Sequence, residues 1–261
     1  MHADVGATLC RPIVINAYAK VNLSLAVIGT EGGMHLLDTI ICPIKLCDVL
    51  TVTRRTGDGA QGITLRYTDG RPHYPNDSVL RTAKLLEAQG ITGLDIVVEK
   101  HIPEGAGLGG SSADAAALLR AVDRIDLARA LGGDVPALCA CEPVRQCGKA
   151  SDLRPVAVPK LHVAIVLQDK PVSTAECFAL YDQIGGEEVD IDAFIARGFT
   201  EPKNALQRSA ERLCPSIATT LRKLSGNVVM TGSGSAVIAY STHKITVPNV
   251  QNRTVITETL A

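Results

Sequence analysis

The stretch of this sequence with the clearest chemistry is a glycine-rich loop followed by a run of small helix-forming residues. Four glycines fall within the six positions Gly105–Gly110, and Ser111 and Ser112 follow directly. Glycines at this density indicate a backbone that adopts positive φ or approaches a ligand closely. The two serines are good N-cap residues, and Ala113–Val122 is expected to form a helix. A glycine loop that leads into the positive end of a helix is typical of a phosphate-binding site.

Three different kinds of glycine-rich segment compete with this interpretation of the loop. A Walker A loop ends in Gly-Lys-Ser/Thr, which is excluded here because Gly110 is followed by Ser111. The spacing Gly105-x-Gly107-x-x-Gly110 matches the dinucleotide-binding fingerprint, but that fingerprint follows a buried parallel strand directly. Here Pro103 and one further residue intervene, so dinucleotide binding is the weaker alternative. The third possibility is a turn that only lets a helix pack closely on a sheet.

Three charged or polar residues elsewhere in the chain are candidates for the chemistry. Residues 13–28 read as a strand, on which Lys20 and Asn22 share one face. They would either meet a polar ligand or lie on a solvated outer face. Asp134 lies between a glycine turn and Pro136, so its backbone is well fixed. The alternative is that this aspartate is an ordinary turn or cap residue.

A second loop of small residues lies near the end of the chain. Thr231–Ser235 separates the apolar runs 228–230 and 236–240, a pattern that also suits a tight hairpin turn. Two such loops in one chain favour a ligand with several negative charges.

The elements that must position these residues are strands and helices in both halves of the chain. We expect a strand over 94–100 before the glycine loop, and a helix over 79–88 that is capped within Asn76–Ser78. Two short runs, 51–54 and 63–67, are expected to form a hairpin. Pro43 is expected to limit the strand 36–50 to an edge or to break it.

A second structural unit is expected to begin near Pro155. Residues 161–167 read as a buried strand, and Ser173–Glu176 is a capping box that opens a helix reaching about Tyr181. A further helix is expected over 216–224.

The composition limits the class of protein. The chain has 261 residues, 46% of them hydrophobic, with a net charge of -1 and no tryptophan. This composition describes a soluble globular protein and predicts neither nucleic-acid nor membrane binding. The eight cysteines include no Cys-x-x-Cys pair, so we expect reduced, mostly buried thiols and a cytoplasmic location. We expect no signal peptide, because Met1–Arg11 lacks its charged and apolar regions.

Three stretches together resemble the GHMP kinases, the superfamily of galactokinase, homoserine kinase, mevalonate kinase and phosphomevalonate kinase. They are Ala19–Leu25, Pro103–Ala117 and Met230–Ala236, and their order and rough spacing also agree with that superfamily. The resemblance implies an α+β fold with two lobes and the ligand cleft between them. The N-terminal lobe would resemble domain 2 of a ribosomal small-subunit protein, and the C-terminal lobe would have a ferredoxin-like sheet.

The resemblance also implies a division of the chain. Residues 1–154 would form the N-terminal ATP-binding domain and residues 155–261 the C-terminal domain. Whether the tail 245–261 returns to the first lobe stays open.

Within the superfamily, the chain is most similar to the kinases of a cytidine-diphosphate sugar alcohol. Four further motifs carry this resemblance: Gly33–His35, Gly133–Pro136, Pro171–Thr174 and Asn204–Leu206. Those kinases usually have tyrosine in place of Met34 and aspartate in place of Ala205.

The resemblance implies a role for each candidate residue. ATP would bind to Pro103, Gly105, Ala106, Gly107, Leu108, Gly109, Gly110, Ser111 and Ser112. Asp134 would accept the proton of the attacking 2-hydroxyl group, and Lys20 would orient Asp134. The sugar alcohol would be bound by Asn22, His35, Thr174, Gly232, Ser233 and Gly234. Mg2+ would neutralise the phosphates because the loop has no lysine, and Ser112 or a neighbouring hydroxyl is a candidate contact for it.

Two alternative functions stay open on the sequence. The chain could be another superfamily kinase of the homoserine or mevalonate type, against which Gly133–Pro136 and His35 argue. It could also be a non-catalytic nucleotide-binding sensor, although it retains both Lys20 and Asp134. The expected ligands are ATP and a small molecule, and the expected state is a monomer or a homodimer.

Overall fold

The structure is a computed structural model that describes residues 11–55, 62–74, 76–148, 152–246 and 253–260. The chain divides into two compact units. Unit 1 comprises Met1–Ala19, Leu46–Ile102 and Gly110–Cys139, and unit 2 comprises Lys20–Lys45, Pro103–Gly109 and Ala140–Ala261. The division into domains 1–154 and 155–261 stays a prediction.

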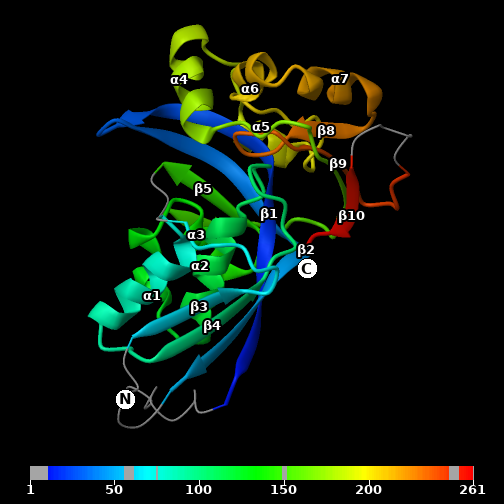
Figure 1. The fold of residues 1–261 in the computed structure, drawn as a ribbon. Coiled ribbons are helices and arrows are strands. Elements are labelled where there is room, and N and C mark those ends of the chain that lie inside the picture. Colours follow the sequence, from blue (N-terminus) through cyan, green and yellow to red (C-terminus); the bar gives the residue numbers. More distant parts are fainter. Residues whose placement is uncertain (1–10, 56–61, 75, 149–151, 247–252, 261) are drawn as a thin grey trace. The chain divides into compact units, whose positions relative to one another are not determined.

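Two long strands contribute residues to both units. They are β1 (Ile13–Glu31) and β2 (Met34–Arg54), which pair with each other (Figure 1). The strand predicted over 13–28 is thus confirmed. Pro43 does not break β2, because it lies between the stretches 37–41 and 49–54, which pair with different strands. No ladder hydrogen bond to either of these two strands is therefore lost at the proline.

The sheet of unit 1 is built around β4 (Leu94–Glu99). This strand runs antiparallel to β2, with Val49 opposite Glu99, and parallel to β3 (Ile63–Tyr67). The predicted hairpin between 51–54 and 63–67 is therefore wrong, because β4 lies between these two strands. A parallel pair needs a long crossover connection, and the helix α1 (Ser78–Ala88) supplies it between β3 and β4.

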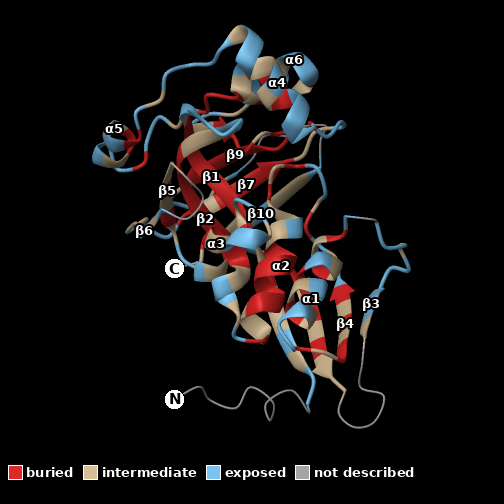
Figure 2. Cartoon of the chain, turned by 90° about the vertical axis from the view of Figure 1, so that its left-hand side faces the viewer, coloured by how far each residue is buried: buried red, intermediate tan, exposed pale blue. Residues whose placement is uncertain are grey.

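Helices α1 and α2 (Gly110–Ala121) pack on each other in unit 1. The side chain of Asp77 caps α1 by accepting a 3.0 Å hydrogen bond from the Leu80 amide, which confirms the predicted cap. Figure 2 shows α2 buried over most of its length, as its alanine-rich sequence allows. The unit also contains a short 3-10 helix (Ile125–Ala130) and α3 (Val135–Ala140).

The start of α2 differs from the prediction. The helix begins at Gly110, so Ser111 and Ser112 lie in its first turn and not at its N-cap. Gly109 has a φ of 71°, which lets the loop turn directly into the helix without a serine cap.

Unit 2 contains two groups of strands. β5 (Val144–Gly148) pairs with residues 37–41 of β2 and with β6 (Leu153–Pro155). The second group is a four-stranded antiparallel sheet in the order β10-β7-β9-β8. Its strands are β7 (His162–Val166), β8 (Asn227–Met230), β9 (Val237–Ser241) and β10 (Thr254–Glu258).

Four helices complete unit 2. They are α4 (Thr174–Ile184), α5 (Ile191–Ala196), α6 (Gln207–Leu213) and α7 (Ser216–Lys223). The predicted capping box is confirmed, because the Ser173 side chain accepts a hydrogen bond from the Glu176 amide. Helices α4, α6 and α7 and the strands β1, β8 and β9 contribute to a core formed by Leu25, Val172, Cys177, Leu206, Ala210, Cys214, Ile217, Met230 and Val237.

Both units combine helices with mainly antiparallel strands, which is an α+β arrangement. Within the described ranges, none of the helices combines the length and the apolar character that crossing a membrane requires.

Candidate functional site

The two small-residue loops of the sequence pack directly against each other in unit 2. A Cβ atom on Gly107 would lie 2.5 Å from the carbonyl oxygen of Thr231 and 3.0 Å from that of Gly234. Gly107 also has a φ of 77°, so glycine is required there both for conformation and for space. The Ala236 amide donates a 3.2 Å hydrogen bond to the Ala106 carbonyl. The glycine loop and the 231–235 loop thus form one backbone-lined surface.

The start of α4 joins this pair of loops. A Cβ atom on Gly105 would lie 2.6 Å from Cβ of Pro171. The hydroxyls of Thr174 and Ser233 are 2.8 Å apart and share a hydrogen bond. Four of the residues assigned from the sequence to ATP or substrate binding, Gly105, Gly107, Thr174 and Ser233, are therefore brought together.

Lys20 places a buried ammonium beside both loops. Its backbone amide donates a 2.9 Å hydrogen bond to the Leu108 carbonyl, and Nζ donates a 2.7 Å hydrogen bond to Oδ1 of Asn22. A Cβ atom on Gly232 would lie 3.1 Å from Nζ. The side chains of Lys20 and Asn22 share one face of β1, as predicted, and this face is buried and not solvated.

Asn22 is held firmly in this position. Its backbone amide donates to the Thr231 hydroxyl at 2.8 Å, and its Nδ2 donates to the Thr39 hydroxyl at 2.9 Å. Asn204, which the sequence reasoning did not assign, donates from Nδ2 to the carbonyls of Met230 and Gly232, at 2.7 and 2.9 Å. The motif Asn204–Leu206 marked this asparagine in the sequence, but nothing in the motif predicted its hydrogen bonds to the 230–232 backbone.

His35 lies in an aromatic cluster with α4. Its ring stacks on Phe178 at 4.6 Å between centroids, and it meets the edge of Tyr181 at 6.1 Å. Nε2 of His35 lies 2.7 Å from Oδ1 of Asp182. The three α4 residues were missed, although their spacing of three and four places them on one helix face. Met34 is 69% exposed.

In unit 1, the first turn of α2 lines a polar pocket. Its volume is about 160 Å3, and it is lined by Asn76, Ser78, Arg81, Ser111, Ser112, Ala115, Leu131 and Val135. Arg81 is a further residue that the sequence reasoning missed. Its signal was its position three residues after Ser78, which puts both on one face of α1. Hydroxyls, an amide and a guanidinium beside a helix N-terminus suit an anion.

Asp134 belongs to unit 1 and directly precedes α3, whose first turn it supports by accepting a 3.0 Å hydrogen bond from the Leu138 amide. Its predicted pairing with Lys20, a residue of unit 2, stays a prediction.

A buried ionic cluster lies where the chain enters the glycine loop. Nζ of Lys100 donates to the carboxylates of Asp48 and Asp114, the latter at 2.7 Å. Burial raises the pKa of Asp114 to about 7, and the negative charge of Asp48 adds to this shift. Burial alone would lower the pKa of Lys100, but the two carboxylates beside it raise it. The cluster therefore keeps its cation, and Asp114 holds its proton up to near-neutral pH.

This cluster predicts a pH dependence of stability. An aspartate of the unfolded chain titrates near 3.8, and Asp114 in the folded protein titrates near 7. Between these values the folded state binds more protons, so the free energy of unfolding falls as the pH rises. We expect a loss on the order of 2 kcal/mol between about pH 4.5 and 7.5, which Asp114→Asn abolishes. Urea unfolding of both proteins at the two pH values measures the difference; an equal loss in the variant would contradict the assignment.

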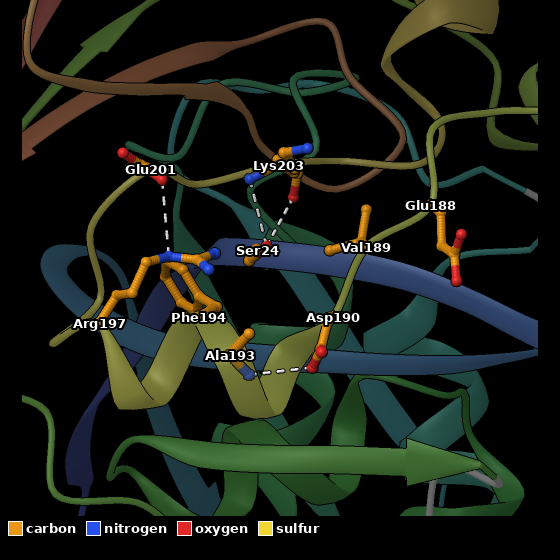
Figure 3. A pocket seen from close by; sticks show the side chains of 9 residues that line it. All are labelled: Ser24, Glu188, Val189, Asp190, Ala193, Phe194, Arg197, Glu201 and Lys203. Carbon is orange, nitrogen blue, oxygen red and sulfur yellow. Dashed lines mark hydrogen bonds and ion pairs between the residues drawn. The ribbon is translucent and has the colours of Figure 1, made fainter.

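A separate pocket of about 310 Å3 lies beside α5 in unit 2 (Figure 3). Its charged side chains are largely paired with neighbouring groups. Arg197 contacts Glu201 at 3.6 Å, Lys203 contacts Glu187, and Asp190 accepts a hydrogen bond from the Ala193 amide. The Ser24 hydroxyl at this pocket donates to the Lys203 carbonyl at 2.8 Å. These pairings stabilise the wall of the pocket.

Comparison with known proteins identifies relatives along most of the chain. Residues 77–138 match the family GHMP kinases N terminal domain. The 4-diphosphocytidyl-2-C-methyl-D-erythritol kinase of Paracidovorax citrulli is 32% identical over 251 residues, which cover 88% of this chain and 87% of that protein. The enzyme of the same name from Paracoccus denitrificans is 36% identical over 235 residues, covering 84% and 83%.

A solved structure supports the same relationship. The crystal structure of a 4-(cytidine 5'-diphospho)-2C-methyl-D-erythritol kinase superposes with a TM-score of 0.77 at 29% identity, covering 95% of this chain and 99% of the other. The expected α+β fold of the GHMP kinases is thereby confirmed.

Proposed function

Since the chain belongs to the 4-diphosphocytidyl-2-C-methyl-D-erythritol kinases of the GHMP superfamily, we propose that it transfers the γ-phosphoryl group of ATP to the 2-hydroxyl group of that compound. The reaction would serve the synthesis of isoprenoid precursors. The observation that carries the proposal is the packing of the Lys20 ammonium and Asn22 beside the two glycine loops.

The phosphates of ATP would bind to the amides of the glycine loop and to the first turn of α2. Gly107 lets the loop backbone approach the 231–235 loop closely while it adopts a positive φ. Arg81 would add the positive charge that the loop itself lacks, from the pocket lined by Ser111 and Ser112.

Mg2+ is the expected partner of ATP. Within the described part of the chain, no three His, Cys, Asp or Glu side chains gather as a metal cage. This fits Mg2+, which is usually held by substrate phosphates, water and one or two protein oxygens. The Ser111 and Ser112 hydroxyls are the oxygens we assign to it. When bound, the ion neutralises charge on the phosphates.

Asp134 and Lys20 would carry out the proton chemistry. The oxygen of the 2-hydroxyl group forms the new bond to the γ-phosphorus, its proton passes to the Asp134 carboxylate, and the bond to the ADP oxygen breaks. An ammonium such as that of Lys20 stabilises both an ionised carboxylate and the charge on the transferred group. Asn22, already fixed by Thr39 and Thr231, would orient the acceptor.

The cytidine would be recognised at His35. The flat faces of His35 and Phe178 offer stacking surfaces for a base. When Nε2 of His35 donates to Asp182, Nδ1 is left as an acceptor, and the exocyclic amine of cytosine is a matching donor. Thr174 and the 232–234 loop would bind the remainder of the substrate. We place the reaction in the cytoplasm, catalysed by a monomer or a homodimer without nucleic acid.

The proposal is tested by measuring ADP release with ATP and Mg2+. The acceptors are 4-diphosphocytidyl-2-C-methyl-D-erythritol, its uridine analogue as a matched control, homoserine and mevalonate. We expect rapid turnover with the cytidine compound only. Equal turnover with the uridine analogue would overturn base recognition at His35. Turnover with homoserine or mevalonate instead would overturn the substrate, and ATP binding without turnover on any acceptor would overturn the kinase.

A further inference from the structure

One buried carboxylate is tied to the residues that directly precede the glycine loop. Asp48 is fully buried on β2, and the register that pairs Val49 with Glu99 places it opposite Lys100. One of its oxygens, Oδ1, accepts hydrogen bonds from the amides of His101 and Ile102, the latter at 2.7 Å. The other, Oδ2, accepts from Nζ of Lys100. Both oxygens are therefore engaged with the residues that directly precede Pro103.

The same cluster reaches the helix that follows the loop. Lys100 also donates to Asp114 on α2, at 2.7 Å. A Cβ atom on Gly110 would lie 3.2 Å from the Ile102 side chain and 3.7 Å from Nζ of Lys100. The chain leaves unit 1 at Ile102 and re-enters it at Gly110. Asp48 and Lys100 thus fix the spacing between the two ends of the loop.

Stability alone does not explain why Asp48, Lys100 and the two backbone amides are arranged in this way. A buried carboxylate is costly unless it is paired and hydrogen-bonded, and replacing such a group by an apolar one is often neutral for stability. The two backbone amides directly before the loop both donate to one oxygen of Asp48. These hydrogen bonds restrict the backbone conformation at the start of the loop more than an apolar core residue would. Loop amides bind an anion more tightly when their N–H groups already point toward one position in the free protein, because ordering them during binding costs affinity.

We propose that Asp48 is a positioning residue for phosphoryl transfer, which, through Lys100 and the amides of His101 and Ile102, preorganises the glycine loop to receive the phosphates of ATP. This inference rests on the proposed function. It concerns ATP alone, because the acceptor is bound by other residues.

A pair of identical substitutions tests the role of Asp48. Asp48→Asn leaves one acceptor oxygen where two are needed, so either the two amides or Lys100 faces an NH2 group. Asp114→Asn removes the other carboxyl group beside the same ammonium, but its single oxygen still serves Lys100, because Oδ1 of Asp114 has no hydrogen-bond partner among the described residues. Leu86→Ala, at a buried position of α1, controls for loss of stability in the same unit.

We expect Asp48→Asn to raise the KM for ATP by about tenfold or more, with the KM for the acceptor within about twofold of the wild type. The KM for ATP should change by less than about twofold in Asp114→Asn and in Leu86→Ala. Equal changes in the two asparagine variants would overturn the proposal, since loss of either carboxyl group beside Lys100 would then suffice. If Leu86→Ala raised the KM for ATP as much as Asp48→Asn does, the role of Asp48 would be structural only.

A second measurement needs no variant. Amide hydrogen exchange of the wild-type protein, followed by NMR, should show His101 and Ile102 protected without ATP and unchanged when ATP is added. Fast exchange that ATP slows would show that the loop mouth is ordered by the ligand, and would overturn the proposal. If the wild-type protein bound ATP but phosphorylated no acceptor, the proposed function would be wrong. The hydrogen-exchange experiment would still test the role of Asp48 in ordering the loop.

Discussion

Asp134→Asn is expected to lower kcat by about 100- to 10,000-fold, because the variant retains the shape of the carboxylate but cannot accept the proton of the attacking hydroxyl. Asp134 directly precedes α3, where the backbone is fixed by its hydrogen bond with Leu138. Asparagine keeps that backbone contact, so the fold should be unchanged. Steady-state ADP release with saturating ATP and acceptor measures the loss.

Asp126→Asn is the matched control for this variant. Asp126 lies in the same unit and pairs with Arg124 at 2.9 Å on the surface. Its replacement should leave kcat within about twofold of the wild type, as expected for an exposed ion pair. The KM for ATP should change little in either variant. A kcat near the wild-type value in Asp134→Asn would remove Asp134 from the mechanism and leave ATP binding as proposed.

Gly107→Ala is expected to lower kcat/KM for ATP by about a hundredfold. The new Cβ atom would lie 2.5 Å from the Thr231 carbonyl, and this neighbour is backbone that cannot rotate away. The glycine loop and the 231–235 loop must therefore separate, and the N–H groups that we propose as phosphate-binding groups move with them. Titration with ATP by calorimetry and steady-state kinetics would both register the change.

Gly148→Ala separates this clash from simple backbone strain. Gly148 also has a positive φ, 76°, but an added Cβ would meet nothing within 4 Å. We expect a loss of about 1–2 kcal/mol in the free energy of unfolding and no change in the KM for ATP. If both alanine variants lose stability alike and keep the affinity for ATP, the close approach of the two loops has no functional role.

Local patterns in the sequence predicted the parts of the fold that depend on neighbouring residues. The alternation over 13–28, the cap at Asp77 and the capping box at Ser173 each depend on a few adjacent positions, and all are present. The hairpin of 51–54 with 63–67 failed because strand pairing is non-local. β4 follows both strands in the chain and yet pairs with each of them.

The candidate site shows the same limit. The glycine loop and Lys20 were recognisable from residue type and spacing, and the structure brings them together. Asn204, Phe178 and Arg81 were missed because their roles arise from tertiary neighbours. Asp48 could not be recognised either, because an acid in a strand reads as an ordinary solvated residue until the register places it opposite Lys100.

The most direct test of the account is the 31P NMR spectrum of the product formed from ATP and 4-diphosphocytidyl-2-C-methyl-D-erythritol. The carbon that bears the 2-hydroxyl group also bears the methyl branch and therefore carries no hydrogen. Phosphoryl transfer to the 2-hydroxyl group predicts one new phosphomonoester resonance without splitting by a neighbouring proton, and its loss in Asp134→Asn. A proton-split resonance would place the phosphate on another hydroxyl, and no new resonance would contradict phosphoryl transfer to this compound.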